Sequence, residues 1–185
     1  TGRSVLTIAA PSNPTYYTLQ TAYLVTVDGP VRSIFGTTSG SPAGGLLSNG
    51  GSITSTGTTV NVSGNFAVGG FAGHTGPTLG TIDLIDNTIT TTGATSIGLE
   101  ASSFGRITAR DSRVTTSGGG AALYATAFNG PASFALANTA VLAQGAGTVG
   151  LYSDNDTPAL TNSVSLSGGS LRSASATAVE VEGPL

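Results

Sequence analysis

The sequence predicts an all-β fold, a parallel β-helix in which short strands stack coil upon coil. Two observations predict it: apolar positions recur at intervals of about 25–36 residues, and the composition favours strands and turns over helices. Self-similarity at such intervals is typical of solenoids, whose units bury their apolar side chains only by stacking on one another. We therefore expect one elongated core made of laddered side chains.

The repeat becomes visible when the chain is aligned on five apolar anchors. They are Ile53, Ile89, Val114, Val141 and Leu171, and the residues seven positions before them are Leu46, Ile82, Ile107, Phe134 and Val164. A turn rich in Gly, Ser or Thr follows each anchor, and a further apolar pair such as Ile97 and Leu99 follows the turn. This pattern predicts two short strands per repeat.

The composition supports β-structure. The 185 residues include 28 glycines, no cysteine and no methionine, and all six basic residues are arginines. Glycine and β-branched residues make a helical repeat costly. Regular hydrophobic columns with little charge of either sign favour ordered strands over a disordered polar tract. Without cysteine the chain has no disulfide and no thiolate metal site.

Two turns are expected in each coil, because glycine, Asp and Asn recur at matching places and tolerate sharp backbone corners. The first turn falls at Asp86-Asn87, Asp111-Ser112, Asn138-Thr139 and Gly168-Gly169. The second falls at Gly57, Gly93, 118–120, 145–147 and 174–176.

The repeat divides the chain into two parts. Residues 1–43 lie outside it, include a strand-like stretch at Leu24–Val27 and are predicted to cap the first coil, whereas residues 44–185 form the coils. Because Val179, Val181 and Leu185 end in mid-pattern, we expect the native protein to continue.

Extra length between Val62 and Leu79 predicts an outward loop or an irregular coil. Its aromatic residues, Phe66 and Phe71 with the neighbouring His74, are the candidate interaction loop. Packing of Phe66, Val68 and Phe71 back on the core is the preferred interpretation, and an exposed hydrophobic binding loop is the alternative.

Catalytic and nucleic-acid-binding groups are sparse. The net charge is −3, and Arg106, Arg110 and Arg113, the one local basic group, are predicted to lie on a solvated outer face beside Asp111. Nucleic acid binding needs a clustered basic face and is therefore disfavoured. The single histidine, His74, has no Gly-x-Ser-x-Gly nucleophile elbow to accompany it.

Two pairs of aspartates are predicted to be turn residues rather than catalytic or metal-binding ones. Asp86 and Asp111 share one register and would stack a coil apart, a spacing that raises one pKa or recruits a cation, but Asn138 follows them in the column. Asp154 and Asp156 likewise occupy a plain turn. We expect no catalytic, cofactor-binding or metal-binding residue, and no cofactor.

The coil pattern over residues 82–101 and the motif Gly150-Leu-Tyr-Ser resemble the pertactin-like, right-handed parallel β-helix passenger domains of bacterial autotransporters, across residues 44–185. The resemblance implies type V secretion through the protein's own C-terminal outer-membrane barrel, outside this chain. It also implies a surface-displayed or secreted protein on the exterior of the bacterial outer membrane, with a role in virulence and cell adhesion. The implied partners are a host surface or matrix protein or a glycan, and strand-edge self-association is a further expectation.

Two other classes remain open. Gly73-His74-Thr75 and Arg106-Ile107-Thr108 faintly resemble elements of pectinase-like, polysaccharide-processing β-helix enzymes, but the two upstream carboxylates such an enzyme needs are missing. An ice-binding solenoid would need an unbroken Thr ladder, and the expected column, which reads Thr54, Thr90, Thr115, Leu142, Arg172, breaks after three coils. The sequence thus predicts a non-enzymatic scaffold and adhesive module.

Overall fold

The computed structural model describes the backbone of residues 7–8, 24–28 and 32–33, and describes residues 44–64, 66–73, 76–77, 79–155, 157–174 and 177–182 in full. These residues form a parallel β-solenoid of about five turns, as the sequence predicts. None of them belongs to a helix with the length and apolar character needed to cross a lipid bilayer.

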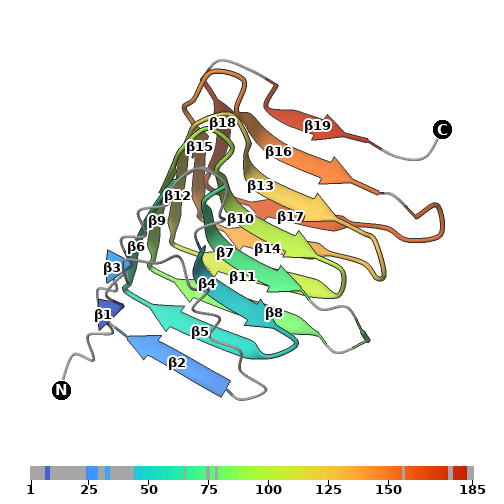
Figure 1. Ribbon diagram of the computed structural model, residues 1–185, viewed down its shortest axis with the longest axis horizontal. Helices are drawn as coiled ribbons and strands as arrows, with labels where there is room; N and C mark the ends of the chain where they lie inside the picture. Colours follow the sequence, from blue (N-terminus) through green and yellow to red (C-terminus); the bar gives the residue numbers. More distant parts are fainter. Residues whose placement is uncertain are drawn as a thin grey trace.

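Three parallel sheets run the length of the solenoid (Figure 1). The first sheet contains β2 (Leu24–Asp28), β5 (Ser52–Thr56), β8 (Gly80–Ile85), β11 (Gly105–Arg110), β14 (Ser133–Ala137) and β17 (Ser163–Ser167). The second contains β6 (Thr59–Ser63), β9 (Thr88–Thr92), β12 (Arg113–Ser117), β15 (Ala140–Ala143) and β18 (Ser170–Ser173). The third contains β4 (Gly44–Asn49), β7 (Val68–Gly73), β10 (Ile97–Ser102), β13 (Ala121–Thr126), β16 (Val149–Asp154) and β19 (Val179–Val181). A separate pair joins β1 (Thr7–Ile8) to β3 (Arg32–Ser33).

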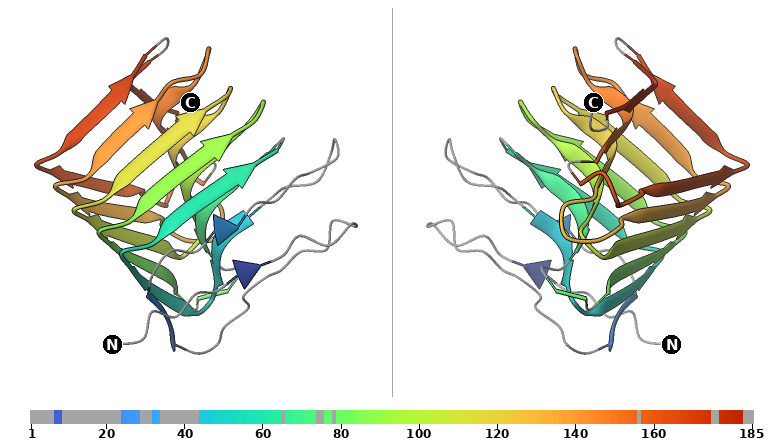
Figure 2. Two further views of the ribbon diagram at one scale, coloured as in Figure 1. Left: turned by 90° about the vertical axis from the view of Figure 1, so that its left-hand side faces the viewer. Right: turned by 90° about the vertical axis from the view of Figure 1, so that its right-hand side faces the viewer.

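Each coil visits the three sheets in turn, so that the chain climbs by one strand per sheet in every coil. The sequence of colours along the axis in Figure 2 shows this order, from blue near the N-terminus to red near the C-terminus. Because a parallel strand hydrogen-bonds only to the coils before and after it, the fold has few contacts between distant coils.

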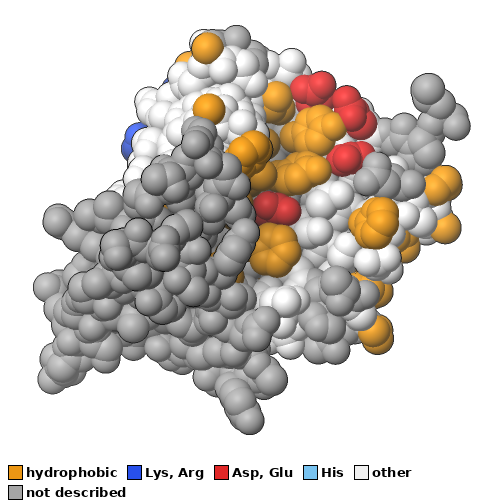
Figure 3. Space-filling model, in the orientation of Figure 1, with side chains coloured by type: hydrophobic (Ala, Val, Ile, Leu, Met, Phe, Trp, Pro, Cys, Tyr) orange, Lys and Arg blue, Asp and Glu red, His pale blue; other side chains and the backbone are white. Residues whose placement is uncertain are grey.

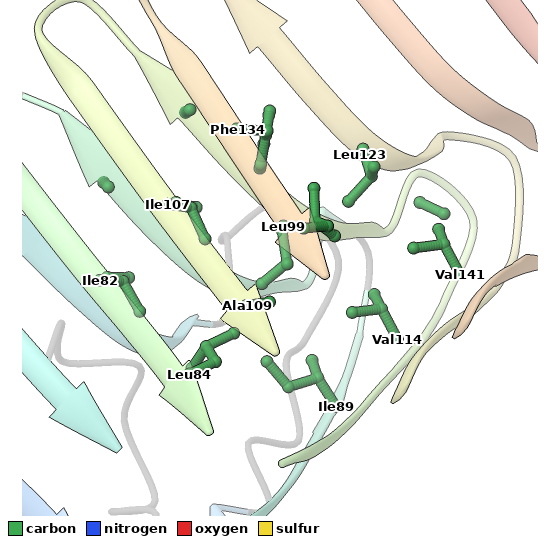
Figure 4. Packing of buried hydrophobic residues seen from close by; sticks show 14 of the residues in the cluster. Ile82, Leu84, Ile89, Leu99, Ile107, Ala109, Val114, Leu123, Phe134 and Val141 are labelled. Atoms are coloured by element: carbon green, nitrogen blue, oxygen red, sulfur yellow. The ribbon is translucent and has the colours of Figure 1, made fainter. Parts of the chain in front are cut away.

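The core consists of apolar columns that point into the space between the sheets (Figure 4). On the first sheet Ile82 pairs with Ile107, which pairs with Phe134, and all three are at most 1% exposed. On the second sheet Ile89, Val114 and Val141 form a matching column. Alternating burial along β8 and β9 explains why the sequence pattern is regular there, since only every second residue must be apolar.

The corner between the first and second sheets is left-handed in every coil. The residues that occupy it have φ angles between 48° and 66°: Gly57, Asp86, Asp111, Asn138 and Gly168. Asp and Asn tolerate this conformation better than other non-glycine residues. The corner amides of Gly57, Asp86, Asp111 and Asn138 each donate to a carbonyl of the next coil, as Asp86 does to Arg110 at 3.1 Å. The first predicted turn is therefore confirmed.

The structure corrects the strand count and the alignment of the first coil. Every coil has three strands rather than two. Ile53 pairs with Ile82 on the first sheet, and Val60 rather than Ile53 precedes Ile89 in the second-sheet column. The error arose because Ile53 and Ile89 both begin a short Thr-rich stretch that ends in glycine. Gly57, with a φ of 61°, occupies the same corner as Asp86, whose φ is 55°. Gly93, with a φ of 141°, belongs to a different turn.

The predicted loop between Val62 and Leu79 is also corrected. Its central part is β7, a regular strand of the third sheet that pairs with β4 and β10. Val60 and Ile89 occupy the same column in successive coils, and their separation along the sequence is similar to that in the later coils. No irregular coil is therefore needed. Leu46, predicted to align with Ile82, instead pairs with Gly70 of β7.

The strand β2 lies within residues 1–43 and pairs with β5, so this part of the segment extends the first sheet. The strand-like interpretation of Leu24–Val27 is thus confirmed, and the capping role of the segment stays a prediction. At the other end, the last coil is open to solvent: Leu166 is 45% exposed and Val179 is 49% exposed.

Candidate functional site

A column of large side chains runs along the outer face of the third sheet, and we call it the outer ladder. Its members occupy one register position on six successive strands: Leu47, Phe71, Glu100, Tyr124, Tyr152 and Glu180. Adjacent strands in a sheet lie about 4.8 Å apart. The ladder therefore places three aromatic rings and two carboxyl groups at closely spaced, fixed positions.

The ladder faces outward because the strands of the third sheet bend. In β10 two consecutive residues, Gly98 and Leu99, are buried, so the outward positions, Ile97 and Glu100, lie three residues apart instead of two. The bend needs a small residue: a Cβ on Gly98 would lie 2.4 Å from the Ala122 carbonyl oxygen. A small residue before a buried leucine thus directs the next side chain outward.

The two tyrosines of the ladder are held in place by each other and by an acid. The ring centroids of Tyr124 and Tyr152 are 5.4 Å apart, with the rings tilted by 35°. The Tyr152 hydroxyl donates a hydrogen bond to Oε2 of Glu182 at 2.5 Å. This hydrogen bond raises the pKa of Tyr152, because it stabilises the protonated phenol, and burial and the surrounding negative charges add to the effect. Tyr152 therefore stays neutral across the physiological range.

Glu100 lies in the ladder between Phe71 and Tyr124. Burial raises the pKa of Glu100 from 4.5 to about 7, because the charged carboxylate loses hydration there. Its carboxyl group thus titrates near neutral pH.

A hollow of about 270 Å³ lies beside the tyrosines. Its apolar part is formed by Ile97, Ala121 and Val149, three residues of one outward column, and the rings of Tyr124 and Tyr152 line it as well. Glu180 lies in the same lining. The hollow therefore combines an apolar surface, two electron-rich rings and one acid.

The charges on this face are negative. Among the described residues, Figure 3 shows acidic side chains next to hydrophobic ones on this face and a basic side chain at the left edge. Arg106, Arg110 and Arg113 belong to β11 and β12 on the other two sheets, where they are exposed as predicted. The strands of the third sheet contain no arginine or lysine. Cations are therefore attracted to this face more than anions.

The predicted interaction loop is not one loop. Phe66 is half exposed, with a φ of 59°, in the turn before β7, so the preferred packing of this residue on the core is wrong. Phe71 is half-buried on the outer face of β7 and belongs to the outer ladder. His74 lies outside the described residues. Of the three predicted residues, Phe71 alone is placed in the ladder.

The carboxylates considered in the sequence occupy turns. Asp86 and Asp111 stand at the left-handed corner one coil apart, and Nδ2 of Asn138 donates to Oδ1 of Asp111 at 3.3 Å. Asp154 ends β16, and Asp156 lies outside the described residues. In the part of the chain that the structure describes, no three His, Asp or Glu residues gather closely enough to hold a metal ion.

The threonine column is corrected as well. Thr90 and Thr115 pair as expected, but Asn61 rather than Thr54 precedes them, and Leu142 and Arg172 follow. Only two threonines are therefore consecutive in this column. The regular Thr surface of an ice-binding solenoid is absent at this position.

Sequence reasoning missed four of the five charged or aromatic members of the ladder: Glu100, Tyr124, Tyr152 and Glu180. The signal was available, because each of them directly follows the last apolar residue of its repeat, Leu99, Leu123, Leu151 or Val179. Hydrophobic periodicity indicates buried positions, and the mixed acidic and aromatic residues of this outward column do not follow it.

Fold and site together define the class: a parallel β-solenoid with an acidic, aromatic ladder on one outer face. Comparisons of the chain with family models, with curated proteins and with solved structures find no match.

Proposed function

We propose that this chain is a non-enzymatic, adhesive scaffold, in which the solenoid presents the outer ladder to a partner. The observation that carries the proposal is the alignment of Phe71, Tyr124 and Tyr152 in one register column on the outer face of a sheet. Tyrosine and phenylalanine are enriched at binding surfaces, because they contribute a large contact area at little conformational cost.

The ladder is suited to binding because strand pairing fixes it. Tyr124 and Tyr152 are held by hydrogen-bonded strands and by their mutual ring contact, so binding would order few side chains. Pre-organised groups lose less entropy on association than groups on mobile loops. This supports the sheet face, rather than the predicted loop, as the binding surface.

One observation favours a second candidate, a pectinase-like enzyme. The raised pKa of Glu100, about 7, lies in the range of a general acid. Glycosidases, however, need a second carboxyl group about 5–9.5 Å from the first. The next carboxylate of the ladder, Glu180, is three strands from Glu100, a backbone separation of about 14 Å. This distance supports the non-enzymatic proposal.

The secretion route is proposed from the fold and the composition. A parallel β-solenoid without cysteine is suited to the passenger of a bacterial autotransporter, exported by type V secretion and displayed on the outer-membrane exterior. Protease accessibility on intact cells that express the full coding region tests this. Digestion of the chain on intact cells is expected, and protection until the cells are lysed would contradict surface display.

We propose two kinds of partner, a host molecule and a second copy of the chain. The outer ladder would contact a host surface or matrix protein or a glycan. Self-association of two copies through strand edges is the second proposed interaction. Sedimentation analysis across protein concentrations tests self-association, and a constant molecular mass would contradict it.

The adhesion experiment measures binding of the purified chain to immobilised matrix proteins and to a glycan panel. The double variant Tyr124→Ala/Tyr152→Ala is expected to lose most of the binding. The matched control is Phe128→Ala, since Phe128 is 60% exposed but lies outside the third sheet. Equal binding by the double variant and the wild type, or no binding to any surface, would overturn the adhesive role.

The enzyme alternative is tested in parallel with polygalacturonate and related polysaccharides. No release of reducing ends is expected. If cleavage is observed, the variants Asp86→Asn, Asp111→Asn and Glu100→Gln identify its source, and loss of cleavage in any one of them would overturn the non-enzymatic proposal.

A further inference from the structure

We propose that the hollow beside Tyr124 and Tyr152 binds a basic side chain, arginine or lysine, of a partner protein. This inference rests on the proposed adhesive function and deepens it, because it names the chemistry that the outer ladder recognises. The site consists of an apolar floor of Ile97, Ala121 and Val149, the two tyrosines as a wall, and the acidic residue Glu180 at its border.

The size of the hollow favours one side chain. Sites for drug-sized ligands enclose about 300–1,000 Å³. The hollow, at about 270 Å³, lies below this range. A long basic side chain has an apolar stem and a compact charged end, and the lining offers an apolar floor for the first and a carboxylate for the second.

The charge of the face selects a cation. Glu180 lines the hollow, Glu182 accepts the hydrogen bond from Tyr152, and Asp154 ends the strand that carries Tyr152. No basic residue occurs in the strands of the third sheet. A bound arginine or lysine would therefore meet complementary charge without competition from a residue of those strands.

The rings add a specific attraction. A cation within about 6 Å of the centre of an aromatic face is attracted by the negative charge of that face. Tyr152 is fixed by its hydrogen bond to Glu182, and its ring contacts that of Tyr124 at 5.4 Å. Donation of the phenolic proton toward a carboxylate increases the electron density of the ring and hence this attraction.

The experiment uses the full chain and a short capped peptide with one arginine. Its control peptide carries citrulline, which keeps the shape of arginine but has no charge. Binding is followed by the chemical shifts of backbone amides in β10, β13 and β16. We expect the arginine peptide to shift amides around the hollow in a saturable manner, and the citrulline peptide to bind about tenfold or more weakly.

Two variants locate the interaction. Glu180→Gln is expected to weaken binding of the arginine peptide about tenfold, because it removes the carboxylate from the hollow. Tyr152→Phe keeps the ring but loses the hydrogen bond to Glu182, and is expected to weaken binding less than Glu180→Gln does. Arg113→Gln, on the second sheet, is the control and should bind as the wild type does. Unchanged circular dichroism verifies that each variant is folded.

Three results would overturn the inference: no saturable shifts with the arginine peptide, equal binding of the citrulline peptide, or unchanged binding by Glu180→Gln. The adhesive role fails separately, in the assay with immobilised partners. If Tyr124→Ala/Tyr152→Ala abolishes adhesion but the arginine peptide does not bind, the ladder binds its partner by other chemistry. In that case the proposed recognition of a basic side chain is wrong, and the adhesive role stands.

Discussion

Ser55 donates its hydroxyl to Oδ1 of Asn87 at 2.8 Å, and so joins two neighbouring coils inside the solenoid. The side-chain nitrogen Nδ2 of Asn87 donates two hydrogen bonds, to the carbonyl oxygens of Ser55 at 2.7 Å and of Ile85 at 2.8 Å. Its backbone N–H bonds to the Ser112 hydroxyl at 3.0 Å, which continues the chain of contacts into the next coil. Asn87 therefore satisfies buried polar groups at the corner where backbone carbonyls turn away from the sheets.

We expect Asn87→Ala to lower the free energy of unfolding by about 3 kcal/mol. The variant removes the oxygen that accepts hydrogen bonds from the Ser55 hydroxyl and the Thr58 N–H, and each buried group left unsatisfied costs about 1–3 kcal/mol. Chemical denaturation measures the change. The control is Asn61→Ala, on the partly exposed surface of β6, which should stay within about 0.5 kcal/mol of the wild type. Similar losses for both variants would show that the Asn87 network does not stabilise the corner.

Val114→Asp tests the apolar column of the second sheet. Val114 is fully buried between Ile89 and Val141, so a carboxylate there would be unpaired and without water. We expect loss of the cooperative thermal transition. Thr115→Asp is the matched control, because the neighbouring side chain points outward and is only partly buried. A cooperative β-rich melt of Val114→Asp would contradict the assignment of this column.

Gly98→Ala tests the bend that presents the outer ladder. The added Cβ would lie 2.4 Å from the Ala122 carbonyl oxygen and 2.6 Å from Cγ1 of Val114, which are too close for either to remain in place. We expect a loss of about 2 kcal/mol from overpacking, measured by denaturation. Gly57→Asn is the comparison: Gly57 has open space around it and a φ of 61°, which Asn138 also adopts, so this variant should be nearly neutral. A neutral Gly98→Ala would indicate that β10 shifts freely against β13.

Glu100 makes the stability depend on pH. Because burial raises its pKa from 4.5 to about 7, the folded chain binds the proton more tightly than the unfolded chain does. The free energy of unfolding therefore falls as the pH rises from 4.5 through about 7, by up to about 3 kcal/mol.

Glu100→Gln checks this dependence, because glutamine keeps the shape and stays neutral. The variant is expected to match the wild type near pH 4.5, and to be the more stable of the two near pH 8. Denaturation curves across this range measure both proteins. Parallel pH profiles for wild type and variant would show that the carboxyl group of Glu100 remains hydrated when folded.

The sequence predicted the later coils better than the first. From Ile82 onward, the apolar columns and the left-handed corner agree with the structure, because buried positions must be apolar and the corner φ favours Asp, Asn or Gly. In the first coil, Ile53 and Ile89 precede similar Thr-rich stretches that lie on different sheets. Local similarity does not decide between registers, whereas strand pairing does.

The candidate site was predicted only in part. Phe71 was singled out for being aromatic, but it was placed in a loop because β7 contains glycines and reads poorly as a strand. Its Gly69 and Gly70 are needed where a Cβ would meet Ile89 and Leu99. The absence of side chains at these two glycines lets the neighbouring coils pack closely, and it also makes the strand hard to recognise from the sequence.

The sequence by itself determined that this protein is a stack of parallel β-coils, because burial in a repeating core imposes apolar residues at regular intervals. Only the tertiary structure decided the register of the first coil, and hence that Phe71 joins Glu100, Tyr124, Tyr152 and Glu180 in one outward column. Outward residues are under no requirement to be apolar, so hydrophobic periodicity does not mark them. Their proximity follows from the register of hydrogen bonds between strands, and that register is fixed only when the coils pack together.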